Sequence, residues 1–172
     1  MSLLPNLENY LCQAHIDYDV IRHGFTNNAY DSACAAHLPV SNVVKAIMLK
    51  RHLADEYVIA AIPAGNKLKI GWVNKELNRD FIIAEELDLA AQFPDCVLGA
   101  VPGLAQAYNM EVIWDDQLSE QSNLYFEAGN HEELIHLSRQ QFAPIFNQYA
   151  HSVISLPAES YSLYHADVMR GD

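Results

Sequence analysis

The chain has 172 residues, of which 51 % are hydrophobic, and a formal net charge of −12. This length predicts one domain with a sizeable core, and no apolar run approaches the ~18 residues that a membrane-spanning helix needs. The negative charge argues against a general nucleic-acid binder, because phosphates would be repelled. We therefore expect neither DNA nor a membrane as a partner.

Basic residues are concentrated in the middle of the chain. Seven of the ten lysines and arginines lie between residues 45 and 79, namely Lys45, Lys50, Arg51, Lys67, Lys69, Lys75 and Arg79. Such a stretch fits a local basic face that holds an RNA end while the rest of the surface repels the duplex. It fits equally well a set of charges on solvated loops and strand edges.

Hydrophobic periodicity predicts a chain that alternates between helices and strands. In the first half we expect helices over 4–14 and 29–37, the second capped by Thr26 or Asn27, and strands over 16–21, 43–49 and 56–62. The last two strands are expected to pair as a hairpin.

The second half continues the alternation with shorter elements. We expect strands over 67–70, 81–83, 111–115 and 123–128, helices over 74–78, 84–93 and 116–120, and a short helix or turn over 104–110. Residues 131–137 fit either a strand or a helix, and residues 150–172 show no strong period. This mixture predicts a mixed sheet flanked by helices, in the α/β or α+β class.

The segment from Phe93 to Gly103 combines two prolines and two glycines between apolar-rich segments. Gly99 permits positive φ, and Pro102 fixes one φ and stiffens the loop. A stiff loop of small residues exposes its backbone N–H groups, which suits a wall that holds a small polar ligand or an oxyanion. The alternative is an ordinary tight turn between strands.

Two further residues are candidates for chemistry. Lys45 interrupts an apolar strand, where a buried ammonium is costly unless it is paired or functional. The alternative places Lys45 on a solvent face, which the neighbouring Val43 and Ile47 make unattractive. His131 follows a glycine near a predicted strand end, a position that suits either a site residue or a surface turn.

The three cysteines, Cys12, Cys34 and Cys96, predict no disulfide framework and no structural zinc site. There is no His-x-x-x-His or Cys-x-x-Cys pattern either, so we expect no metal and no cofactor. Free thiols and an N-terminus without a signal-peptide pattern predict a cytoplasmic protein. Cys96 could be a nucleophile with His131 as its base, or a small packing residue.

Three motifs in register resemble the YbaK/prolyl-tRNA synthetase-associated editing domains. These are Val43-Val44-Lys45-Ala46-Ile47, Asp95-Cys96-x-x-Gly99-Ala100-Val101-Pro102 and Tyr125-Phe126-Glu127-Ala128-Gly129-x-His131. The resemblance covers roughly residues 7–142 and implies a curved, partly barrel-like mixed sheet. It favours a strand before a helix over 138–149. One departure is that Gly99 and Pro102 are separated by two residues, where many members have three.

The resemblance implies a free-standing hydrolase that deacylates mischarged aminoacyl-tRNA, with an aminoacyl-tRNA synthetase as a further partner. The small side chains of the loop suggest that the substrate carries a small amino acid. The residues that it implies as catalytic are Lys45, Gly99, Ala100 and His131, and those that it implies as substrate-binding are His23, Thr26, Cys96, Val101, Pro102 and Gly129. The alternative is a non-catalytic module that binds tRNA or an aminoacyl group. We expect residues 1–149 to form the domain and residues 150–172 an extension docked on it.

Overall fold

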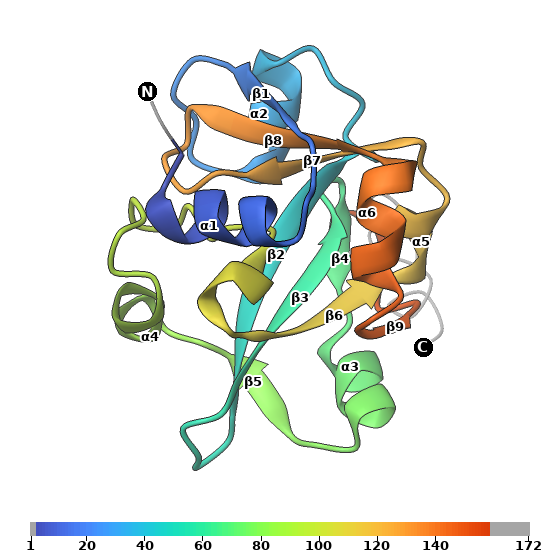
Figure 1. The fold of residues 1–172 in the computed structure, drawn as a ribbon. Coiled ribbons are helices and arrows are strands. Elements are labelled where there is room, and N and C mark those ends of the chain that lie inside the picture. Colours follow the sequence, from blue (N-terminus) through green and yellow to red (C-terminus); the bar gives the residue numbers. More distant parts are fainter. Residues whose placement is uncertain (1–2, 159–172) are drawn as a thin grey trace.

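The computed structural model describes residues 3–158, whose centre is an eight-stranded mixed sheet (Figure 1). The strands run in the order β1-β8-β7-β2-β3-β6-β9, and β5 pairs with β2 beside this path. Their bounds are β1 Asp19–Arg22, β2 Val43–Arg51, β3 Tyr57–Pro63, β5 Phe81–Ile83, β6 Glu111–Asp115, β7 Asn123–Glu127, β8 Glu133–Ser138 and β9 Ala150–Ser152. A separate two-stranded ladder joins β4, Asn66–Leu68, to β10, Ser155–Pro157.

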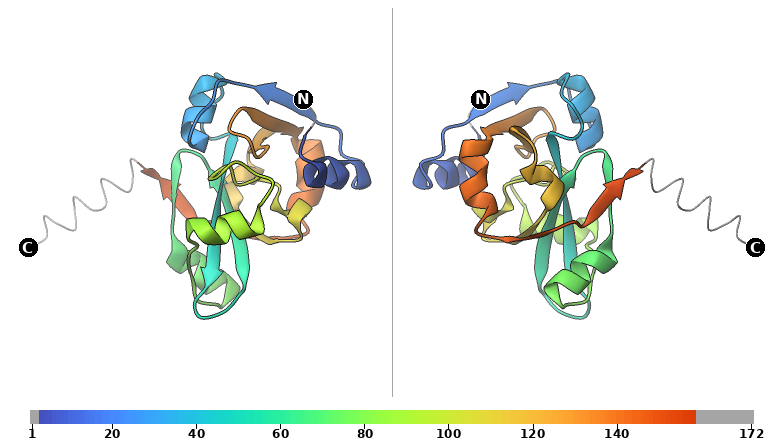
Figure 2. Two further views of the ribbon diagram at one scale, coloured as in Figure 1. Left: turned by 90° about the vertical axis from the view of Figure 1, so that its left-hand side faces the viewer. Right: turned by 90° about the vertical axis from the view of Figure 1, so that its right-hand side faces the viewer.

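Helices cover both faces of the sheet (Figure 2). Their bounds are α1 Pro5–Gln13, α2 Ala29–Ala35, α3 Ile70–Leu77, α4 Glu86–Gln92, the 3₁₀ helix η1 Ala105–Tyr108, α5 Asp116–Ser119 and α6 Arg139–Phe146. Figure 2 shows α1 and α6 on one face, and α2 and α3 on the other. This arrangement confirms the mixed sheet flanked by helices that the sequence predicts.

Strand β2 contributes to the core on both faces because its side chains alternate. Val44 and Met48 point into the larger core, which α1 and α6 cover. Val43 packs against α2, and Leu49 packs in a second core against α3. Removing these side chains from water is the main favourable term for the fold. Lys45 shares the face of Val43 and Leu49, and lies in the half-buried middle of the strand between these two packed ends.

The same middle section of β2 has an open edge. β2 pairs along its length with β3, but β7 pairs only with Val43 and Val44, and β5 only with Leu49 to Arg51. Within residues 3–158, the stretch between these two partners therefore has no strand beside it on that side. A loop or a ligand can approach the backbone there.

Most of the expected elements are confirmed within a few residues. The β2–β3 hairpin is present, β5 and β6 have the expected bounds, and the segment after His131 is a strand followed by α6. Three details were wrong. The cap of α2 is Asn28, whose side chain accepts from the Asp31 N–H. Helix α3 begins at Ile70 rather than at residue 74, and β1 begins only at Asp19.

The segment after α6 continues in regular structure despite its lack of period. β9 pairs in parallel with β6, and β10 pairs antiparallel with β4. Short edge strands of three residues are too brief for an alternating pattern to be recognised, and their partners are distant in sequence. The rest of the expected extension, residues 159–172, lies outside the described residues.

Candidate functional site

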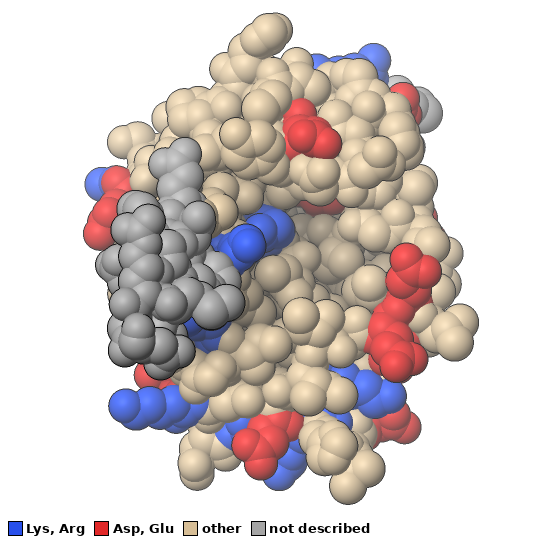
Figure 3. Space-filling view, turned by 180° about the vertical axis from the view of Figure 1, so that it is seen from behind, with Lys and Arg blue, Asp and Glu red and all other residues tan. Residues whose placement is uncertain are grey.

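A cleft of about 210 Å³ lies at the open edge of β2. Four segments that are far apart in the sequence form its walls. The lining residues are Asn27, Asn28 and Ala29 before and in α2, Val43 to Ile47 of β2, Gly99 and Val101 of the glycine–proline loop, and Glu127, His131 and Leu134 around the β7–β8 turn. Figure 3 shows that the face opposite to that of Figure 1 is hollowed, with basic side chains reaching into the hollow.

Lys45 is the lysine in the wall of this cleft. Its Nζ donates to the main-chain carbonyl oxygen of Asn66 at 2.5 Å, and its other two N–H donors have no hydrogen-bond partner among residues 3–158. Burial, followed by repulsion from Lys67, lowers the pKa of the Lys45 ammonium below its ordinary value. The result is a half-buried ammonium with capacity to bind an anion or an oxygen-rich group.

A buried polar network holds the acceptor of Lys45 in place. The Asn66 side chain donates to Ser155 Oγ at 3.0 Å, and Ser155 Oγ donates in turn to Asp115 Oδ2 at 2.5 Å. Asp115 is fully buried and also accepts from the N–H groups of Gln117 and Ile154. A buried carboxylate with several donors is well compensated, so this network is rigid.

The turn between β7 and β8 is built around the carboxylate of Glu127. Its Oε1 accepts from three successive N–H groups, those of Gly129 at 2.8 Å, Asn130 at 3.1 Å and His131 at 3.1 Å. Gly129 and His131 both have positive φ, of 106° and 63°, and such a turn aims successive N–H groups at one anion. The turn thereby presents both Glu127 and His131 to the cleft.

His131 connects this turn to the glycine–proline loop. Its Nε2 lies 3.0 Å from the carbonyl oxygen of Leu98, and a carbonyl can only accept, so Nε2 carries a proton. The residue is 5 % exposed, and its ring packs edge-on against Phe25, with 5.4 Å between ring centroids. His131 therefore acts as a brace for the loop, because its Nε2 is already engaged.

The glycine–proline loop offers particular N–H groups to the cleft. Gly99 has a φ of 81°, and the Ala100 N–H donates to the Val97 carbonyl within the loop. Among the described backbone contacts, the N–H groups of Gly99 and Val101 have no acceptor. Gly99 and Val101 also line the cleft, whereas Ala100 does not.

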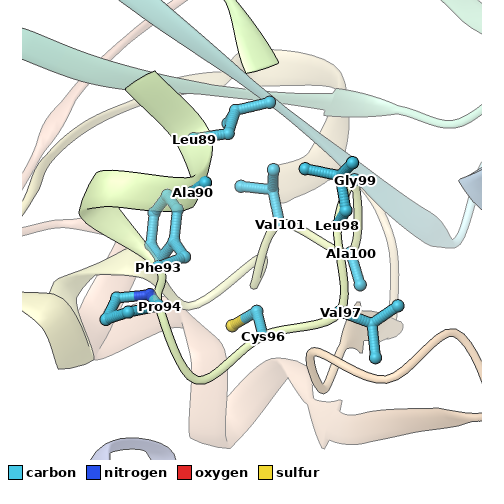
Figure 4. Close-up of a pocket in the computed structure, with 10 residues that line it drawn as sticks. All are labelled: Leu89, Ala90, Phe93, Pro94, Cys96, Val97, Leu98, Gly99, Ala100 and Val101. Carbon is cyan, nitrogen blue, oxygen red and sulfur yellow. The ribbon is translucent and has the colours of Figure 1, made fainter. Parts of the chain in front are cut away.

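Cys96 lies on the other side of this loop, in a smaller pocket of about 100 Å³ (Figure 4). Figure 4 shows the chain from Phe93 to Val101 curving round that pocket, with Leu89 and Ala90 of α4 beside it. The Cys96 sulfur lies 3.6 Å from the Tyr108 hydroxyl. Burial raises the pKa of the Cys96 thiol to about 12, so the reactive thiolate is disfavoured at neutral pH.

The structure brings some of the expected site residues together and separates others. Lys45, Gly99, Val101 and His131 line the cleft, whereas Cys96 and Ala100 line only the smaller pocket. The remaining four line neither cavity; these are His23, Thr26, Pro102 and Gly129.

Three of these four support the cleft from outside it. The Thr26 N–H donates to the His131 carbonyl at 3.2 Å, and the Thr26 hydroxyl bonds to Ser32 at 2.7 Å. Gly129 faces Leu4 and Cys96, and its carbonyl accepts from the Val97 N–H at 2.8 Å. Pro102 is buried in the loop. His23 contacts the Gly24 carbonyl instead, at 2.7 Å.

Sequence reasoning missed three polar residues of the cleft, Asn27, Asn28 and Glu127. The sequence did contain an indication that Glu127 belongs to the site, because this residue lies in the segment Tyr125-Phe126-Glu127-Ala128-Gly129 that carries the resemblance. Within residues 3–158 no group of three potential metal ligands comes together, and no helix has the length and apolarity to cross a bilayer.

The comparisons with known proteins agree on the fold. A sequence model of the aminoacyl-tRNA editing domain matches residues 26–144, more than half of the chain. The hypothetical protein APE2540 has a similar crystal structure, with a TM-score of 0.76 and 16 % identity, covering 88 % of this chain and 99 % of that one. No curated protein matches the sequence.

Two further solved structures are similar. A candidate trans-editing enzyme for prolyl tRNA synthetase has a TM-score of 0.72 and 16 % identity, covering 90 % of this chain and 99 % of that one. A candidate signal transduction protein from Marinobacter aquaeolei VT8 has a TM-score of 0.69 and 13 % identity, covering 90 % of this chain but 31 % of that one. At such identities these structures establish the shared fold alone.

Proposed function

We propose that this chain, which belongs to the aminoacyl-tRNA editing domain family, is a hydrolase that deacylates mischarged aminoacyl-tRNA. The observation that carries this proposal is the meeting of Lys45, Gly99 and His131 in one cleft. They come from three segments with no common local structure. The similarity to a candidate trans-editing enzyme supports an action on tRNA that a synthetase has already released.

The reaction requires little nucleophilic machinery, because an aminoacyl ester is already activated. Water, assisted by a ribose hydroxyl of the substrate, attacks the ester carbonyl, and the carbonyl oxygen becomes an oxyanion. The free N–H groups of Gly99 and Val101 would donate to that oxyanion, and His131 holds their loop through the Leu98 carbonyl. The C–O bond to the ribose then breaks and releases the tRNA and the free amino acid.

In this proposal Lys45 binds the RNA terminus of the substrate. Its half-buried ammonium has two free donors and would bind the terminal phosphate or the ribose oxygens. Holding the ester against the loop makes the reaction effectively unimolecular, because the reacting groups are already positioned. This positioning accounts for a large part of the required reduction in the activation barrier. A cleft of about 210 Å³ favours a small amino acid over a large one.

A non-catalytic binding module is the second candidate. The observation that favours it is that His131 Nε2 already donates to a carbonyl oxygen, so the cleft has no evident free base at that atom. Incubation with a panel of mischarged tRNAs separates the two functions. We expect release of a small amino acid from at least one tRNA; saturable binding without release on every tRNA would assign the chain to the binding class.

A further inference from the structure

Glu127 places a carboxylate in the wall of the cleft, and no other side chain among residues 3–158 pairs with this carboxylate. Its Oε1 is satisfied by three main-chain N–H groups of the β7–β8 turn. Its Oε2 has no hydrogen-bond partner among residues 3–158, and no lysine or arginine within that range forms an ion pair with Glu127. Oε2 is not fully buried, so it remains available to accept a hydrogen bond from a ligand in the cleft.

The cleft therefore carries two opposite charges that do not pair with each other. Lys45 and Glu127 both line it, yet no ion pair joins them. Asn28, a neutral polar residue that also lines the cleft, caps α2 and donates to the Asp31 carboxylate. Among the lining residues Glu127 is the one carboxylate, and Lys45 is the one lysine or arginine.

The end of an aminoacyl-tRNA carries the complementary pair of charges. A phosphate lies on the RNA side of the ester, and an α-ammonium lies one carbon from the carbonyl. Since Lys45 is assigned the RNA side, the amino-acid side needs an anionic group that accepts N–H donors. Of the residues that line the cleft, Glu127 has that chemistry.

We propose that Glu127 binds the α-ammonium of the aminoacyl group, so that the substrates are esters with a free α-amine. This rests on the proposed function and narrows its substrate class. An N-acylated aminoacyl-tRNA has no α-ammonium, and its acyl group would occupy the space beside Glu127. Such esters would be spared, although they have the same tRNA and the same side chain.

The competing view is that Glu127 merely braces the β7–β8 turn. Glu127→Gln separates the two roles, because an amide oxygen can still accept the three N–H groups while the charge is lost. Glu132→Gln is the matched control. Glu132 is an exposed acid of the same turn that lies outside the cleft.

The experiment compares alanyl-tRNA with N-acetylalanyl-tRNA made from it. Each kcat/KM is divided by the spontaneous hydrolysis rate of the same ester, because acetylation also slows the uncatalysed reaction. We expect the wild type to prefer the free amine by about 10- to 100-fold, the scale of a hydrogen bond to a charged group. Glu127→Gln should lose that preference by losing activity on alanyl-tRNA alone, and Glu132→Gln should keep it.

A binding measurement makes the result independent of turnover. The probe is 3′-alanylamido-3′-deoxyadenosine, an amide that the enzyme cannot readily hydrolyse, with its N-acetyl form as the comparison. If wild-type protein hydrolyses neither ester, the proposed function fails, and this binding comparison still decides the role of Glu127. Equal hydrolysis of both esters by the wild type, or equal affinity of Glu127→Gln and wild type for the free-amine probe, would overturn the proposal.

Discussion

Lys45 Nζ lies 2.5 Å from the main-chain oxygen of Asn66, so the lysine of β2 is held by the residue that begins β4. β4 pairs with β10, and Asn66 also bonds to Ser155 of β10. The position of the ammonium thus depends on a segment that follows the end of the family match at residue 144. This relationship links the chemistry of the cleft to the stability of the C-terminal strands.

Removing the lysine should affect activity far more than stability. Lys45→Ala should cost about 2–4 kcal/mol of transition-state stabilisation in deacylation, the scale of one fixed charged contact in a desolvated site. The fold should tolerate it, because removal of the ammonium also relieves its desolvation. Single-turnover deacylation and urea unfolding measure the two effects. Lys75→Ala, an exposed lysine of α3, is the control; equal activity of the two variants would contradict the role of Lys45.

Ser155→Ala should affect both stability and turnover. The serine accepts from Asn66 and donates to the buried Asp115 carboxylate, so its loss removes one hydrogen bond from each of two buried side chains. We expect a decrease of about 1–3 kcal/mol in the free energy of unfolding. We also expect a lower kcat, because Asn66 is then less firmly placed under Lys45. Ser152→Ala in β9 should change neither quantity; a stable Ser155→Ala with normal kcat would show that the network does not position the lysine.

Two glycines with positive φ should differ in their tolerance of alanine. At Gly99 an added Cβ would lie 3.8 Å from His131 Nε2, which is an ordinary contact. Gly99→Ala should therefore lower the free energy of unfolding only through the strain of the left-handed backbone, by about 1–2 kcal/mol. At Gly129 it would lie 2.6 Å from Leu4 Cδ1 and 3.1 Å from Cys96 Sγ, so a clash adds to the backbone strain. In thermal unfolding, the melting temperature of Gly129→Ala should therefore be lower than that of Gly99→Ala. Gly24→Ala, with open space around it, serves as the reference.

Cys96 should be dispensable and slow to react. Its raised pKa means that the thiolate is scarce until the pH approaches about 12. Alkylation of Cys96 by iodoacetamide, followed by peptide mass spectrometry, should therefore stay slow between pH 7 and 9, while the exposed Cys12 and Cys34 are modified first. Cys96→Ala should retain most deacylase activity. A loss of more than about 100-fold in a folded variant would instead favour a covalent mechanism.

Local patterns in the sequence were sufficient for much of the fold. The apolar runs of β2 and β3 predicted these strands, because a buried strand needs little more than a continuous apolar stretch. The same reasoning identified Lys45, since an ammonium within such a run is costly wherever the strand lies. The density of glycine and proline around Gly99 marked the loop for a similarly local reason.

The composition of the cleft was decided by tertiary structure alone. It depends on β7 joining β2 only at Val43 and Val44, which leaves the adjoining edge open for the loop and the β7–β8 turn. Sequence patterns do not encode which side of an irregular loop an N–H group points to, so Ala100 could not be separated from Gly99 and Val101. Nor do they show that Glu127 has one oxygen bound and one free. Contacts between distant segments settle these points, because each depends on a register that no single segment specifies.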